Sequence, residues 1–233
     1  KLSPSIGFNL YQNDSLYSNS KAGFTISHPL NSSISAQIIA EKETSTKTNA
    51  ISTAQNFQKT GVGFGILYTP DNKNIQTSTT LYRNTRKTIN KTVAYQLHAT
   101  ITSTLELSNK LHIYLKNTTK LTTNDSSLEN ELFRSGGMNS IRGYQENAIL
   151  SNSFTLFNTE VRFQTTNKTA LYTIQDIGLF RISQKNELLS SLGLGYQFQQ
   201  KNNMFNIAYL LNTSKQNNTF KSAFISIKMS TMF

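Results

Sequence analysis

Apolar residues recur at every second position over stretches of about ten residues along most of this chain. In one such stretch Val62, Phe64, Ile66 and Tyr68 alternate with three glycines and one leucine, namely Gly61, Gly63, Gly65 and Leu67. A period of two is the spacing of side chains on one face of a β-strand. About ten residues is the length of a tilted strand that crosses a bilayer, whereas strands of soluble sandwiches usually have about five or six. The same alternation recurs at 6–10, 22–26, 34–38, 93–101, 111–115, 157–163, 192–198, 205–211 and 223–229.

These stretches predict an all-β fold with about twelve strands in a transmembrane antiparallel β-barrel. The partners of the apolar residues are mostly Ser, Thr, Asn, Gln and Gly, as expected for a wall with lipid on one side and water on the other. Only 15% of residues are charged, and the chain has 10 Tyr and 14 Phe, so it does not have the composition of a disordered chain. A soluble sandwich or lectin-like β domain is the alternative left open.

The connections between the predicted strands differ in length. Short turns at 28–33 and 69–73 alternate with longer polar stretches at 41–53 and 122–150. Short turns on one side and long loops on the other are typical of outer-membrane barrels. The chain contains no run of 18 apolar residues, so no transmembrane helix is predicted. We therefore expect a bacterial outer-membrane location, with outer-membrane lipid, including lipopolysaccharide, as a partner.

The formal net charge is +11. Such a charge fits an anionic lipid surface or a cationic lumen. The basic residues are dispersed and no nucleic-acid-binding motif accompanies them, so we expect no nucleic-acid partner.

A different signal lies at 133–150, FRSGGMNSIRGYQENAIL, where three glycines fall within eight positions around one arginine. A phosphate-binding loop would need a helix directly after the glycines, and nothing after Gly143 has helical periodicity. A simple turn needs only one or two glycines. The stretch therefore indicates a more specialised loop.

The segment GGMNSIRGY resembles the [VI]RG[FY] loop of the BamA/TamA superfamily, which includes two-partner secretion transporters and organellar barrel-assembly proteins. The resemblance implies that the region 122–150 re-enters the lumen and that the arginine contacts acidic residues on the strands that follow. The implied lumen salt bridge joins Arg142 to Glu160, in NTEVRF, and to Asp176, in IQDIGLF, where Ile174 replaces the usual aromatic residue. The loop residues carried over with it are Gly136, Gly137, Gly143 and Tyr144.

Strand parity supports the same pairing independently of the resemblance. Glu160 alternates with Val161, and Asp176 alternates with Ile177, so both carboxylates are predicted to face inward. An arginine between two carboxylates forms charge-assisted hydrogen bonds that a lysine cannot reproduce.

The resemblance also implies what surrounds this chain. We expect residues 1–233 to be the C-terminal part of a sixteen-stranded barrel, with further strands and periplasmic POTRA domains before Lys1. A natural twelve-stranded barrel is the alternative. The last strand ends on Phe233, which resembles the assembly signal of bacterial outer-membrane barrels.

No constellation of residues indicates an enzyme. The chain has no cysteine, His28, His98 and His112 are scattered, and no cofactor or metal site is predicted. Four glutamates at predicted strand ends and loops are interpreted as solvated charges, namely Glu41, Glu43, Glu129 and Glu131.

The resemblance favours a barrel-assembly or protein-translocation pore, which would act by strand templating at the seam between its first and last strands. Its partners would be client outer-membrane or secreted proteins, with periplasmic or lipoprotein accessory subunits. The alternatives are a two-partner-secretion-type transporter and the membrane anchor of an upstream patatin-like lipase.

Overall fold

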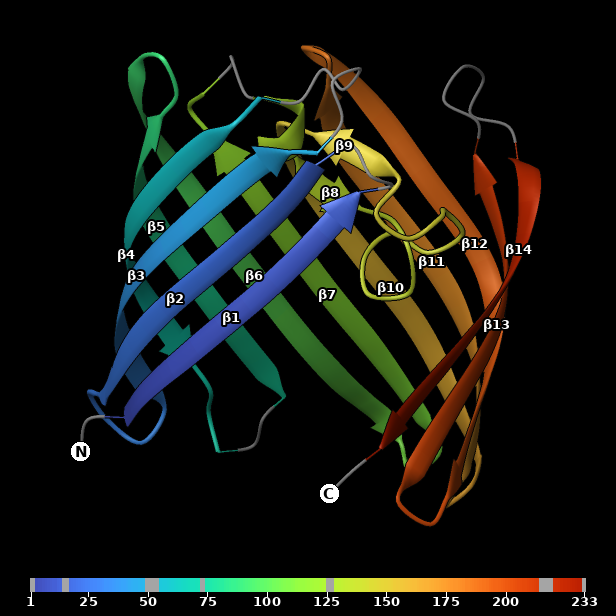
Figure 1. Cartoon of the computed structure of the whole chain (residues 1–233). Coiled ribbons are helices and arrows are strands. Elements are labelled where there is room, and N and C mark those ends of the chain that lie inside the picture. The colour runs from blue at the N-terminus through green and yellow to red at the C-terminus, as the bar shows by residue number, and fades with distance from the viewer. Residues whose placement is uncertain are drawn as a thin grey trace. The chain divides into compact units, whose positions relative to one another are not determined.

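Twelve long strands form one antiparallel sheet in the computed structural model (Figure 1). The structure describes residues 3–13, 17–48, 55–71, 74–124, 128–213 and 220–231. In this part of the chain the sheet order is β1 to β7 followed by β10 to β14, so that β1 and β14 are its edges. The prediction of an all-β antiparallel fold with about twelve strands is confirmed. Within the described residues, no helix is long and apolar enough to cross a membrane.

The strands of this sheet have the following bounds: β1 (Ser3–Asn13), β2 (Tyr17–Pro29), β3 (Ile34–Lys47), β4 (Phe57–Tyr68), β5 (Ile75–Lys87), β6 (Lys91–Ser108), β7 (Leu111–Thr122), β10 (Ser153–Thr166), β11 (Thr169–Ile182), β12 (Lys185–Gln200), β13 (Asn203–Thr213) and β14 (Phe220–Thr231). Two short strands, β8 (Phe133–Ser135) and β9 (Ile149–Ser151), form a separate two-stranded sheet, and a 3-10 turn, η1, covers Glu129–Glu131.

The chain divides into two compact units. The first contains residues 1–100 and 119–132, and the second contains residues 101–118 and 133–233. Strands β6 and β7 contribute residues to both units.

In the first unit, alternation places exposed apolar side chains on one face of β1–β5. The register pairs Ile38 with Phe64 and Phe64 with Leu81, and these side chains are 60%, 56% and 55% exposed. The glycines that alternate with them in β4 are buried on the other face. An exposed apolar face of this kind is what lipid contacts in a membrane barrel.

The opposite face of the first unit carries paired charges. Lys21 Nζ lies 2.8 Å from Glu41 Oε2, and Lys59 Nζ lies 2.6 Å from Glu43 Oε2. The interpretation of Glu41 and Glu43 as solvated charges in a loop was therefore wrong. Both lie within β3, which continues to Lys47 because its carboxylates find cations on the neighbouring strands.

Glu131 was also misinterpreted as a solvated charge. It forms an ion pair with Arg86 of β5, and both side chains are buried. Beside it, the Asn130 side chain donates to Ser45 Oγ (2.6 Å) and to the Gln55 carbonyl oxygen (2.8 Å). These contacts hold the 3-10 turn against the inner face of β3 and β5.

The second unit differs because one part of its inner face is apolar. Inward residues of β10, β11 and β12 form a buried cluster with two residues of the 133–150 region. The members of this cluster are Ile141, Ile149, Phe154, Leu156, Phe180 and Leu189. The sequence interpretation assigned apolar residues of these strands to the lipid side only, but the inner face also carries apolar residues, which are buried against the 133–150 region.

Candidate functional site in the arginine loop

The region 133–150, here called the arginine loop, begins and ends in a short antiparallel ladder. Strand β8 pairs with β9, and Phe133 lies opposite Ser151. The ladder brings the two ends of the loop together and leaves 136–148 to fold as a compact tip, which is yellow-green in Figure 1.

Glycines allow the backbone of this tip to turn and to lie close to the wall. Gly136 has φ +112°, and a Cβ atom there would lie 2.1 Å from the carbonyl oxygen of Gln145. Gly143 has φ +82°, and a Cβ atom would lie 3.3 Å from Cβ of Ser191 on β12 and 3.4 Å from Cβ of Leu210 on β13. Residues other than glycine adopt such φ values at a cost. Gly137 shares this conformation, with φ +86°.

Arg142 lies at the centre of the site and forms four hydrogen bonds to two carboxylates. Its backbone N–H and its Nε donate to Asp176 Oδ2 at 2.8 and 2.9 Å, and its Nη2 donates to Asp176 Oδ1 at 2.6 Å. Its Nη1 donates to Glu160 Oε1. The contact with Asp176 is a bidentate fork, a geometry that guanidinium provides and ammonium does not.

The register of the strands explains why the carboxylates converge on the arginine. Asp176 of β11 lies between Asn158 of β10 and Ser191 of β12, on the inner face. Glu160 is two residues farther along β10 on the same face and also accepts a hydrogen bond from Arg162 Nε at 2.6 Å. Inward parity therefore places both acids on the inner face in adjacent rows of side chains.

The three charged side chains are almost completely buried. Arg142 and Glu160 are 5% exposed, and Asp176 is 0% exposed. Burial alone lowers the pKa of the Arg142 guanidinium, but the hydrogen bonds and charge of Asp176, followed by those of Glu160, outweigh it and raise the pKa above its usual range. The guanidinium therefore remains charged, and its positive charge is balanced locally by the two acids.

Several polar contacts that the sequence did not reveal fix the rest of the tip. Asn158 Nδ2 donates to the Ser140 carbonyl oxygen (2.9 Å), and Asn212 Nδ2 donates to the Gly143 carbonyl oxygen (2.6 Å). Tyr144 Oη donates to the Ser190 carbonyl oxygen at 3.2 Å. The sequence offered one indication of a role for Asn158 and Asn212. Strand parity places both on the inner face.

Ile141, next to Arg142, is also outside the sequence prediction. Its side chain is fully buried among Leu156, Phe180 and Leu189 of the wall. The loop is therefore held by apolar packing as well as by the ion pairs. Adjacent apolar residues in β10 and β12, such as Leu188 and Leu189, were the sequence signal that both faces of these strands carry apolar side chains.

A polar cavity of about 230 Å³ lies beside the arginine. Its lining is rich in cations, and one of them, Lys228 of β14, donates to Asn139 Oδ1 of the loop at 2.8 Å. Such a lining can bind anionic or hydrated polar groups. Among the described residues, no group of three His, Asp or Glu side chains could hold a metal ion. Phe233, the predicted assembly signal, lies outside the described residues.

No protein-family model matches the chain, and no curated protein matches it. Among solved structures, the chain is similar to BamA from Haemophilus ducreyi lacking POTRA domains 1–3, with a TM-score of 0.75 and 13% identity, over 99% of this chain and 59% of that one. It is also similar to CdiB from Acinetobacter baumannii, with a TM-score of 0.67 and 13% identity, over 91% of this chain and 42% of that one.

The chain thus spans less than two thirds of either protein. The structural similarity bears out the resemblance to the BamA/TamA superfamily at the level of the fold, and this chain therefore has the fold of the BamA and CdiB barrels.

Proposed function

We propose that this chain is the barrel of a bacterial outer-membrane protein that inserts or translocates other polypeptides. The observation that carries the proposal is the arginine loop, fixed to the inner wall by Arg142, Asp176 and Glu160. A pore for passive diffusion needs no buried bidentate ion pair inside its wall. A protein that moves another chain needs a fixed internal element against which that chain is guided.

The edge strands provide the second part of the proposed mechanism. Strands β1 and β14 each pair on one side only in the described sheet. An edge strand presents unpaired N–H and C=O groups, and a client strand can add to it by β-augmentation. The backbone supplies the hydrogen bonds, so that clients of different sequence are accepted and no cofactor takes part.

The test is an assembly assay in lipid vesicles. Vesicles that contain the folded chain should accelerate folding of a urea-unfolded small outer-membrane barrel, measured as the heat-modifiable band on a gel. Vesicles with Arg142→Ala should accelerate it less, and empty vesicles give the baseline. Equal folding rates in all three preparations would contradict the proposal.

Transport of one secreted protein through the lumen is the second candidate function. The observation that favours it is the polar cavity beside Arg142, where Lys116, Arg162 and Lys228 meet on one inner surface. Vesicles loaded with an unfolded polypeptide distinguish the two candidates, because release through the wall requires a transport path and client insertion does not.

A further inference from the structure

The outward face of the first unit changes from apolar to cationic along β3, β4 and β5. Residues that lie opposite each other on these three strands form rows across the face. The register aligns Ile38, Phe64 and Leu81 in one row of β3, β4 and β5. The next row is Ala40, Val62 and Arg83. Above it lie the rows Lys42, Thr60, Thr85 and Thr44, Gln58, Lys87. Rows on one face are about 6.6 Å apart, so the three cations lie within about 15 Å of the edge of the apolar band.

This end of the strands is the end with the longer connection. Residues 48–56 join β3 to β4 next to the cations, whereas residues 30–33 join β2 to β3 at the other end. In outer-membrane barrels the longer loops are extracellular. Lys42, Arg83 and Lys87 are therefore at the level of the lipid headgroups of the outer leaflet.

The cations on this face have no acidic neighbours. The outward positions of β2 to β5 contain no Asp or Glu, and in the described chain none of the three forms an ion pair with a carboxylate. All three residues are exposed. The acids of this unit lie on the inner face instead, where Glu41, Glu43 and Glu131 pair with inward cations. The outer face consequently carries an uncompensated positive charge.

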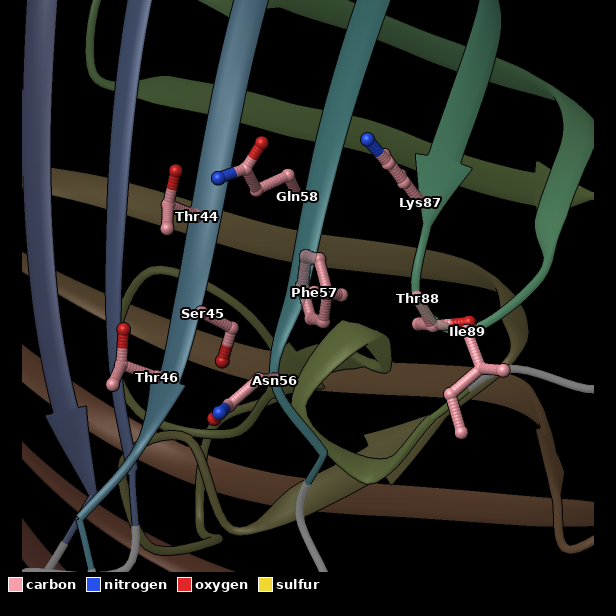
Figure 2. Close-up of a pocket in the computed structure, with 9 residues that line it drawn as sticks. All are labelled: Thr44, Ser45, Thr46, Asn56, Phe57, Gln58, Lys87, Thr88 and Ile89. Atoms are coloured by element: carbon pink, nitrogen blue, oxygen red, sulfur yellow. The ribbon is translucent and has the colours of Figure 1, made fainter.

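A cleft of about 490 Å³ adjoins the upper row (Figure 2). Figure 2 shows Thr44, Gln58 and Lys87 projecting to the same side of the strands, and Thr46, Asn56 and Thr88 also line the cleft. Hydroxyl and amide groups of this kind donate to and accept from sugar hydroxyls. Phosphate groups prefer lysine and arginine, and arginine can bind them bidentately.

We propose that this face binds the headgroup of a phosphorylated glycolipid of the outer leaflet. Lys42, Arg83 and Lys87 bind its phosphates, and the cleft beside Gln58 accepts its sugar. The inference rests on the proposed function in one respect, since the chain must form a membrane barrel for this face to meet lipid. It goes beyond that function by assigning a specific lipid class to a specific site.

The experiment uses the full chain folded in phosphatidylcholine nanodiscs that contain a small fraction of one lipid probe. The probes are a diphosphorylated glucosamine-disaccharide lipid, its phosphatase-treated form, and phosphatidylglycerol. Native mass spectrometry measures how much of each probe stays on the protein. The variant carries Lys42→Gln, Arg83→Gln and Lys87→Gln. The matched control removes the same charge from turns at the opposite strand ends, with Lys110→Gln, Lys168→Gln and Lys201→Gln.

We expect the wild type and the control to retain the diphosphorylated lipid and the variant to bind it about a hundredfold more weakly, since each of the three basic residues removed strengthens binding of anionic lipid about fivefold. An equal loss of diphosphorylated lipid in the variant and the control, or no loss in either, would overturn the assignment of its binding to this face. Equal retention of phosphatidylglycerol would overturn the assignment of a sugar to the cleft. A chain that does not show the heat-modifiable folded band in lipid would contradict the proposed function itself, whereas the other outcomes concern this site alone.

Discussion

At the residue scale, Arg142 is held by two buried carboxylates, and only Glu160 of the two has a second arginine partner, Arg162, in the described chain. Asp176 is fully buried and accepts three hydrogen bonds from this one residue. Removing one member of a buried pair leaves the other charge in a poorly solvated site, which is more costly than replacing both members. The stability of the loop should therefore depend on the pair and not on either residue alone.

Arg142→Ala is expected to lower the free energy of unfolding by roughly 3–5 kcal/mol, as is typical for breaking a buried ion pair. Limited proteolysis should cut the loop near Gly143 faster, while the strands remain folded. Arg142→Lys should restore only part of the protection, because an ammonium group cannot make the bidentate contact with Asp176.

A double-mutant cycle with Asp176→Ala separates the pair from other effects. The two substitutions together should cost less than the sum of the single ones, with a coupling energy between about 0.5 and 3 kcal/mol. Lys110→Ala is the control for loss of a positive charge, since Lys110 is exposed and has no carboxylate partner among the described residues. Strictly additive losses would mean that Arg142 and Asp176 do not stabilise each other.

At the scale of the strand, alternation in β14 separates an exposed apolar face from a polar face. Ile225 and Ile227 are 74% and 70% exposed. The residues that alternate with them, Ser226 and Lys228, lie on the opposite face of the strand and are less exposed. The inward position of Lys228 is marked by its hydrogen bond to Asn139 of the loop.

Cysteine labelling in vesicles tests this alternation. A membrane-impermeant maleimide should react with Ser226→Cys through the water-filled lumen and leave Ile227→Cys unlabelled, because lipid covers it. Detergent-solubilised and urea-unfolded samples of both variants control for intrinsic reactivity. Similar labelling of the two positions in vesicles would be inconsistent with a membrane barrel.

Strand periodicity made much of this fold predictable. A period of two over about ten residues is enough to predict a long strand. The same alternation predicted that Glu160 and Asp176 lie on the inner face of the strands after the loop. The structure brings these acids together with Arg142, the residue singled out from the motif.

Other features depend on contacts between segments that are distant in sequence. Alternation could not reveal that Leu156 and Phe180 face a covered interior, because the covering residue, Ile141, lies in a loop without periodicity. The end of β3 was placed too early for a related reason. Two glutamates close together, Glu41 and Glu43, suggest a polar loop. They lie in a strand because Lys21 of β2 and Lys59 of β4 pair with them, and sequence alone does not show these partners.

At the scale of the whole molecule, the proposed function requires that a chain with 36% hydrophobic residues enters a membrane. Each strand is only half apolar, so no single segment inserts by itself and assembly must be cooperative. A terminal recognition signal is one way to begin such a process, and the chain ends on an aromatic residue, Phe233.

Phe233→Asp, or deletion of residues 229–233, should therefore reduce the amount of folded protein in outer-membrane fractions more than it reduces the stability of the protein that does fold. The heat-modifiable gel band of membrane fractions gives the first quantity, and urea titration of the purified protein gives the second. Ser230→Ala is a nearby control that leaves the aromatic terminus intact. Wild-type amounts of folded protein after the deletion would exclude a role of the terminus in assembly.

If the chain translocates polypeptides as proposed, the apolar cluster on the inner face of β10 to β12 would affect the opening of its pore. If the arginine loop withdrew, Leu156, Phe180 and Leu189 would face water inside the wall, and Ile141 would lose burial worth about 1.5–3 kcal/mol. Apolar constrictions resist wetting and act as barriers to ions and water. Thermal fluctuations would then seldom empty this side of the lumen, and a polypeptide in transit would pass beside the seated loop. The loop would in that way keep the membrane sealed while a much larger molecule crosses it.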